Sequence, residues 1–252
     1  MIILPQSRGV LSARRAGGGG GGSPGGSPTD SPTDPYFATV VNLTHFDDGG
    51  SPSPSTFENA AAHGIGLSRR NDVPSTTESV FGGSAMRRVN DDACAFASHA
   101  DWQFGTNDFT VEFWFRPDAV DLKSIFDMRA NVAGQIGLVI YIEATGQIKL
   151  WANLADRITS STGIIVANTW AAIAVSRVSG TTRMFVDGVQ VGSDYTDAND
   201  YNQTASIYLG SFSDVKRNAY YDELRVSNGL YGSGAGRYSG NYTVATAAFP
   251  DS

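Results

Sequence analysis

The chain has 252 residues, of which 41% are hydrophobic and 17% are charged, and its formal net charge is −7. This hydrophobic content can supply a packed core and excludes a wholly disordered chain. The excess of acidic residues argues against a specific nucleic-acid partner, and the absence of an apolar run of about 18 residues argues against a membrane partner.

The N-terminal segment differs in charge from the rest of the chain. Residues 1–28 hold three arginines, no acidic residue and nine of the 29 glycines, so the other 224 residues carry a charge of −10. We predict a basic docking arm over residues 1–16 and a Gly/Ser/Pro-rich linker over residues 17–35, with a disordered leader as the alternative to the arm. The residues expected to dock are Ile2, Ile3, Leu4, Arg8, Arg14 and Arg15. Because the first apolar run ends at Pro5, no signal peptide is expected.

Short β-strands are predicted from residue 36 onward. Asp108–Pro117 alternates apolar residues with Thr, Glu, Trp and Arg, so one face of this strand should be buried. Asp187-Gly188 lies between two alternating segments and predicts a hairpin. Further strands are expected over residues 136–143, 147–153, 170–178, 183–186, 189–191, 206–210 and 220–227. Residues 58–63 could form at most a helical turn or two, so we predict an all-β fold, an antiparallel jelly-roll β-sandwich over residues 36–252.

Cysteine and histidine are scarce. The single cysteine, Cys94, excludes an intrachain disulfide, is expected to be buried, and fits a chain made in a reducing cytoplasm. His45 is expected on a strand, and His63 and His99 in surface loops. No pair of these residues has the spacing of zinc ligands, and no catalytic residue is assigned.

Five stretches, taken in chain order, resemble one family. They are Leu43–Gly49, Asp108–Pro117, the strand pair formed by Trp170 with Ala172–Val178 and by Arg183–Gly188, Ile207–Gly210 and Tyr221–Val226. Together they resemble the strands of laminin-G-like domains in the concanavalin A-like lectin/glucanase superfamily. At the two ends, Asp34–Val41 and Gly236–Asp251 resemble the laminin-G-like domains of tailed-bacteriophage structural proteins.

The resemblance implies a virion protein that is assembled in the host cytoplasm. Its docking arm would bind a capsid or tail scaffold protein, and its β-sandwich would be displayed outward, as capsid decoration or for adhesion to host surface polysaccharide. A homo-oligomer is a further expectation. The alternative function is a free or surface-attached carbohydrate-binding lectin module.

A glycanase is the least favoured class. Glycanases of the resembled superfamily carry an E-x-D-x-x-E cluster, in which alternate side chains of one strand supply the two carboxylates that the reaction needs. Glu112 stands alone on its strand, and the adjacent Asp222 and Glu223 are expected to point to opposite faces. We therefore predict that the protein is not an enzyme.

The resemblance also implies one structural Ca²⁺. Asp222 would bind it together with backbone carbonyls near Asp47 and Gly83. The residues alone allow a second interpretation, in which Asp222 pairs with Arg225 or a backbone donor and Asp47 only begins a turn.

Sugar binding requires exposed aromatic rings with polar side chains around them. The candidates are Trp114 and Trp151 on strands, with Arg129 and Asn153 near the strand ends, close in sequence to Asn131 and Asp156. Trp102 and Trp170 are expected in the core. Asp194–Gln203 is either a recognition loop or a solvated loop.

Overall fold

The computed structural model describes residues 33–47, 56–57, 60–61, 67–68, 73–89, 94–129, 137–202, 206–210 and 218–252. The predicted docking arm and most of the linker lie outside the described residues, as do His63, Asn131 and most of the segment 58–63. Among the described residues no helix is long and apolar enough to cross a membrane.

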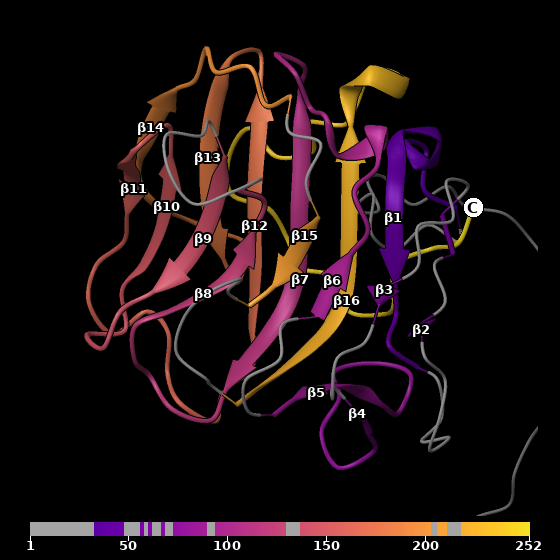
Figure 1. The fold of residues 1–252 in the computed structure, drawn as a ribbon, viewed down its shortest axis with the longest axis vertical. Helices are drawn as coiled ribbons and strands as arrows, with labels where there is room; N and C mark the ends of the chain where they lie inside the picture. Colours follow the sequence, from indigo (N-terminus) through magenta and orange to yellow (C-terminus); the bar gives the residue numbers. More distant parts are fainter. Residues whose placement is uncertain are drawn as a thin grey trace, which may run out of the picture.

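Two antiparallel sheets form a β-sandwich, so the predicted all-β fold is confirmed (Figure 1). The first sheet contains β1 (Val40–Thr44), β4 (Val73–Ser75), β5 (Ala85–Arg88), β7 (Phe109–Pro117), β12 (Ala171–Val178), β13 (Thr181–Val186), β14 (Val189–Thr196) and β16 (Ala219–Asn228). The second contains β2 (Thr56–Phe57), β3 (Leu67–Ser68), β6 (Cys94–Phe96), β8 (Lys123–Asp127), β9 (Leu138–Ile142), β10 (Ile148–Ala152), β11 (Ala155–Thr159) and β15 (Ile207–Leu209). The order in the first sheet is β14-β13-β12-β7-β16-β5-β4, with β1 paired to β16, and in the second it is β11-β10-β9-β8-β15-β6-β3-β2. The described residues also include three short 3-10 helices: η1 (Phe37–Thr39) before β1, η2 (Ala100–Trp102) between β6 and β7, and η3 (Gly229–Tyr231) after β16.

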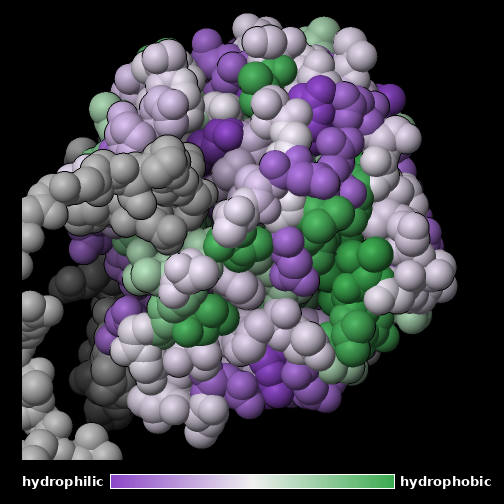
Figure 2. Space-filling model, turned by 180° about the vertical axis from the view of Figure 1, so that it is seen from behind, coloured by the Kyte–Doolittle hydropathy of each residue, from purple (hydrophilic) through white to green (hydrophobic). Residues whose placement is uncertain are grey.

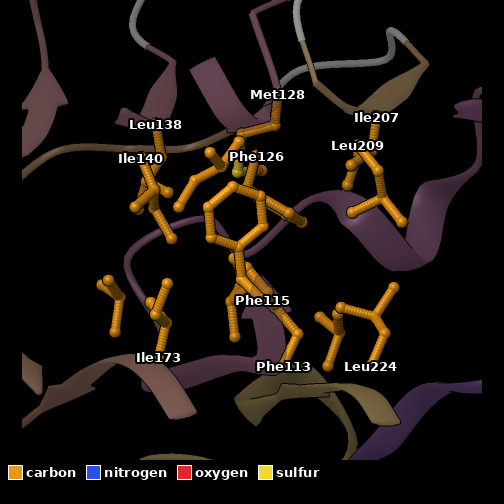
Figure 3. Close-up of a cluster of buried hydrophobic side chains, with 14 of the residues drawn as sticks. Phe113, Phe115, Phe126, Met128, Leu138, Ile140, Ile173, Ile207, Leu209 and Leu224 are labelled. Atoms are coloured by element: carbon orange, nitrogen blue, oxygen red, sulfur yellow. The ribbon is translucent and has the colours of Figure 1, made fainter. Parts of the chain in front are cut away.

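The core lies between the sheets and follows the predicted alternation. On β7 the four apolar residues predicted to share a face are all buried in one cluster, namely Phe109, Val111, Phe113 and Phe115. Figure 3 shows Phe113, Ile173 and Leu224 pointing from one sheet toward Phe126 and Ile140 of the other. Cys94 is buried, as predicted.

Two hairpin turns have backbone conformations that favour particular residues. Asp187 and Gly188 have φ of 50° and 75°, so both residues of the predicted turn are left-handed, as a type I′ turn requires. The turn between β10 and β11 uses Asn153 and Leu154, with φ of 47° and 64°. A leucine in this region is strained, and its side chain is 61% exposed.

A β-bulge corrects the expectation that Asp222 and Glu223 point to opposite faces. The register of β16 against β7 shifts between Asp222 and Arg225, and Glu223 has a φ of 51°. Tyr221 and Leu224 both reach the core, so the two acidic residues between them lie on the outer side. Strict alternation fails here because a bulge inserts one extra residue into the strand.

The C-terminal segment, residues 232–252, crosses the outer face of the first sheet. Tyr242 N–H donates to Gly188 O at 2.9 Å, and Phe249 N–H donates to the Glu223 carboxylate at 2.9 Å. These contacts tie the segment to the β13–β14 turn at one edge of the sheet and to β16 near its middle.

The surface is uneven in polarity. In Figure 2, which shows the domain from behind the view of Figure 1, hydrophobic residues gather in a band on one side and hydrophilic residues lie around it. A hydrophobic band with a polar rim is typical of a contact surface.

Candidate functional site

Glu112, the lone carboxylate of the outer face of β7, is buried in a charged network. Its carboxylate accepts a hydrogen bond from Arg225 Nε at 2.8 Å and another from the Tyr238 hydroxyl at 2.7 Å. Asp34 lies 3.3 Å from Arg225 and 2.8 Å from Arg237, and joins the network although the sequence placed it in the linker. Burial and the neighbouring Glu112 raise the pKa of Tyr238, which keeps this hydroxyl a donor. Glu112 is 4% exposed and fully partnered, which is unsuited to general acid or nucleophilic chemistry.

The C-terminal segment covers the sheet beside Glu112. Tyr238 and Tyr242 are stacked with ring centroids 3.7 Å apart, and Tyr242 meets Phe185 edge-on at 5.5 Å. A small hollow remains between the sheet and this segment, lined by Glu112, Tyr238 and Phe249 among others. Glu112 therefore lies in the wall of this hollow, under the C-terminal segment.

Trp151 and Arg129 are brought together on the second sheet. Trp151 is half-buried on β10, and the Arg129 guanidinium lies 5.7 Å from its ring centroid, within cation–π range. Asp127 holds this guanidinium in place, with an Nη2-to-Oδ2 distance of 2.5 Å. The pair combines an aromatic face with fixed polar groups.

Asn153 lies at the end of the same strand, in the strained turn before β11. Its side-chain amide donates to Asn199 Oδ1 at 3.1 Å, and Arg157 donates to the Asn153 carbonyl at 2.8 Å. The Arg157 guanidinium also lies 5.3 Å from the ring centroid of Tyr195. The turn is therefore bonded to the segment that sequence reasoning marked as a recognition loop or a solvated loop.

The described part of that segment, residues 194–202, begins as the end of β14 and is then anchored by buried side chains. Asp197 and Tyr201 are 3% and 0% exposed, and the Tyr201 hydroxyl donates to Asp197 at 2.9 Å. Arg177, which is 0% exposed, donates to the Asn199 carbonyl at 3.0 Å. A buried arginine that binds backbone carbonyls gave no sequence signal, because its partners are set only by the fold.

Trp114 is separated from the other candidates. It is half-buried on the outer face of β7, in the first sheet, and meets Phe81 edge-on at 6.0 Å. Trp114 and Trp151 therefore belong to two different surfaces. Trp102 is 1% exposed, as predicted. The prediction that Trp170 lies in the core is wrong, since this side chain is half-exposed just before β12, with its ring 6.2 Å from that of Tyr220.

The three residues of the implied Ca²⁺ site lie in one region. The Asp222 carboxylate accepts hydrogen bonds from Val80 N–H at 2.7 Å and Phe81 N–H at 3.2 Å, so the backbone donor expected as its alternative partner is present. The Asp47 carboxylate lies against Gly82, next to Gly83 with its φ of 97°. A side chain at position 82 would overlap that carboxylate.

The charges of this region suit a hard cation. The pKa of Asp222 is raised to about 7, chiefly by burial and further by the nearby Glu223 and Asp47, and the backbone hydrogen bonds from Val80 and Phe81 only partly offset this rise. Burial also raises the pKa of Asp47. Ca²⁺ prefers carboxylate and carbonyl oxygens, which are the donors present here. No group of three or more acidic, histidine or cysteine side chains is arranged for a metal within the described residues, so carbonyls and water would have to complete the shell.

His45 is a further residue of this region. It follows β1, and its two ring nitrogens lie 2.8 Å from carboxylate oxygens of Glu223 and Asp251. Burial lowers its pKa, but the two carboxylates outweigh burial and raise it to about 9. The protonated ring therefore joins the first strand to the bulge and to the C-terminal segment.

Comparison with known proteins defines the family. Residues 89–231 match the family model described as the concanavalin A-like lectin/glucanases superfamily. Because the match covers more than half of the chain, the chain belongs to this superfamily, as the resemblance implied. No curated protein sequence matches the chain.

Several solved structures share the fold. Trypanosoma rangeli sialidase in complex with sialic acid is 14% identical with a TM-score of 0.56, over 76% of this chain and 31% of the sialidase. Domain 4 of AbnA, an extracellular GH43 arabinanase from Geobacillus stearothermophilus, in complex with arabinotriose, is 15% identical with a TM-score of 0.56, over 75% of this chain and 92% of that domain. The receptor-binding domain of botulinum neurotoxin type G is 12% identical with a TM-score of 0.53, over 75% of this chain and 47% of that domain. At these identities the likeness concerns the fold alone.

Proposed function

We propose that the protein is a non-enzymatic structural protein of a tailed-bacteriophage particle, and that its β-sandwich binds host surface glycans. The observation that carries the glycan-binding role is the half-buried Trp151 under the Arg129 guanidinium, on the strand that ends at the turn where the Asn153 amide binds Asn199. An aromatic ring can stack on the apolar face of a sugar, and fixed amide and guanidinium groups can bind its hydroxyls. That one solved structure with this fold is a complex with arabinotriose is consistent with such a role.

The non-enzymatic part of the proposal is supported by Glu112. Both of its carboxylate oxygens are bound, by Arg225 and Tyr238, and the C-terminal segment covers it. Neither an accessible acid nor a second carboxylate at the spacing used by glycosidases accompanies it on β7.

Attachment to a particle is supported by the positions of the ends of the domain. Asp34 N–H donates to Ser252 O at 2.6 Å, so the start and the end of the described domain lie together beside β1. Figure 1 shows β1 and the C-terminus at one edge of the sandwich and β10 at the opposite edge. An arm at residues 1–16 that binds a capsid or tail scaffold would thus leave β10, which carries Trp151, at the edge far from the start of the described domain.

We also propose that one structural Ca²⁺ binds at Asp47 and Asp222, with the Gly83 carbonyl. The ion would neutralise two carboxylates whose pKa values are raised by burial. It would join the loop before β5 to β16.

Three measurements test the proposed function. Mass spectrometry of purified particles should detect the chain, and deletion of residues 1–16 should release it; a chain absent from particles that still binds glycans would be a lectin module. Binding to a panel of bacterial surface polysaccharides should be weakened at least tenfold by Trp151→Ala, with Leu122→Ala, another exposed position, as the control. Release of reducing ends that is abolished by Glu112→Gln would overturn the non-enzymatic assignment.

A further inference from the structure

A second polar and aromatic surface lies on the outer face of the first sheet. On neighbouring strands Tyr220 pairs with Arg116 of β7 on one side and with Arg87 of β5 on the other. The guanidiniums of Arg87 and Arg116 lie 4.2 Å and 5.2 Å from the Tyr220 ring centroid, and Trp170 lies 6.2 Å from it. These four residues, Arg87, Arg116, Trp170 and Tyr220, form what we call the Tyr220 row.

Two further rings extend the row along the sheet. Trp114 lies next to Arg116 on the outer side of β7, opposite Ala172 of β12, and Phe81 meets it edge-on at 6.0 Å. The four aromatic side chains of this surface are all only half-buried, namely Phe81, Trp114, Trp170 and Tyr220. Four neighbouring aromatic rings partly open to solvent on one face are more than the scattered apolar groups of an ordinary surface.

The charges of the Tyr220 row are balanced. Asp118 binds Arg87 through two hydrogen bonds of 2.8 Å and 2.5 Å, and Glu78 lies 3.3 Å from Arg116. Bidentate pairing fixes the guanidinium plane. The row therefore offers fixed donors and acceptors without a net charge.

This combination selects a class of ligand. A phosphate or a uronic acid would need an excess of positive charge, which the paired arginines do not supply. A neutral sugar presents an apolar ring face to an aromatic side chain and hydroxyls that both donate and accept hydrogen bonds. Ala172, beside Trp114 on β12, is 6% exposed and lines the hollow under the C-terminal segment, so a ligand would reach Trp114 from the side of the Tyr220 row.

We propose that the Tyr220 row, with Trp114 and Phe81, is a second glycan-binding surface, selective for neutral saccharides. This inference rests on the proposed glycan-binding function and adds a site on the sheet opposite Trp151. Two surfaces on opposite sheets would let one domain contact two glycan chains, or two segments of one chain, and raise the avidity of a particle.

The four tryptophans give a direct test, because each reports on a different place. Indole ¹⁵N–¹H spectra of the full chain would show Trp151 on the second sheet, and Trp114 and Trp170 on the first. Trp102 is 1% exposed and donates to Ala97 O at 3.0 Å, so it is an internal control. The probes are neutral gluco-, galacto- and rhamno-oligosaccharides, with an oligogalacturonate as the acidic comparison.

We expect at least one neutral oligosaccharide to shift the Trp170 and Trp114 signals in a saturable way, with Trp102 unchanged and the acidic probe weaker. Trp170→Ala should weaken this binding at least tenfold and leave the Trp151 shifts unchanged, and Trp151→Ala should do the converse. If only Trp151 responds, the second surface is wrong and the proposed function stands. If none of the four signals responds to any probe, and no polysaccharide binds, the proposed function itself fails.

Discussion

Replacing Glu112 by glutamine should destabilise the domain although the side chain hardly changes in volume. Breaking a buried ion pair costs about 3–5 kcal/mol, since a charge is left without its partner. Arg225 keeps Asp34 at 3.3 Å, and glutamine keeps one acceptor, so we expect a loss near the lower limit, about 3 kcal/mol. Arg225→Met should cost more, about 4 kcal/mol, because Glu112 would retain only the Tyr238 hydroxyl and a distant Arg237, 3.9 Å away.

The double variant decides whether the two side chains act as a pair. Once one partner is removed, the second substitution should cost little, so the double variant should lose about 4 kcal/mol rather than the sum of about 7 kcal/mol. The assay is urea unfolding followed by tryptophan fluorescence and circular dichroism, with the m value compared across variants. Losses that add within about 0.5 kcal/mol would refute the coupling and the buried network with it.

Three other expectations concern the rest of the domain. Chelation with EGTA should lower the melting temperature of the wild type by several degrees, because the ion binds only the folded state. The melting temperature of Asp222→Asn should not change on chelation. Equal melting temperatures of the wild type with and without Ca²⁺ would exclude the structural ion. In EGTA, the contribution of His45 to stability should be complete below its unfolded pKa of about 6.5 and lost as pH rises through about 9. The loss should reach roughly 3 kcal/mol at most and vanish in His45→Asn, and a pH profile identical in both proteins would contradict it. Leu154→Gly should raise the free energy of unfolding by about 1 kcal/mol, because the residue has a φ of 64°; a loss of stability would show that the side chain packs on the folded domain.

The alternation of apolar and polar residues predicted most of the strands, because every second residue of a strand points into the core. The four buried residues of β7 and the turn at Asp187-Gly188 follow from that period and from turn chemistry. The same period could have placed Trp170 correctly. Ile173 and Val175 are the bulky core residues of β12, so Trp170 has the opposite parity and faces outward with Ala172.

The candidate site was less predictable because its partners come from distant parts of the chain. Arg129 and Trp151 are 22 positions apart and meet only because β8, β9 and β10 are neighbours. The hydrogen bond from Asn153 to Asn199 depends on the β10–β11 turn, in which Leu154 has a positive φ that a leucine rarely adopts. Contacts between side chains on different strands leave no local pattern in the sequence. The sequence could therefore indicate candidate residues but not which of them lie together.

The bulge at Glu223 connects the proposed Ca²⁺ site to the aromatic residues of the first sheet. It turns Asp222 and Glu223 to the same outer side, and Asp222 then holds the backbone of Phe81, whose ring packs against Trp114. A cation at Asp222 would therefore also fix Phe81 and Trp114, the two rings that extend the Tyr220 row. Because Trp151 lies on the other sheet, removal of Ca²⁺ should weaken binding at Trp114 and Trp170 and spare Trp151. The bulge would thus make the proposed second surface, and not the first, dependent on the proposed ion.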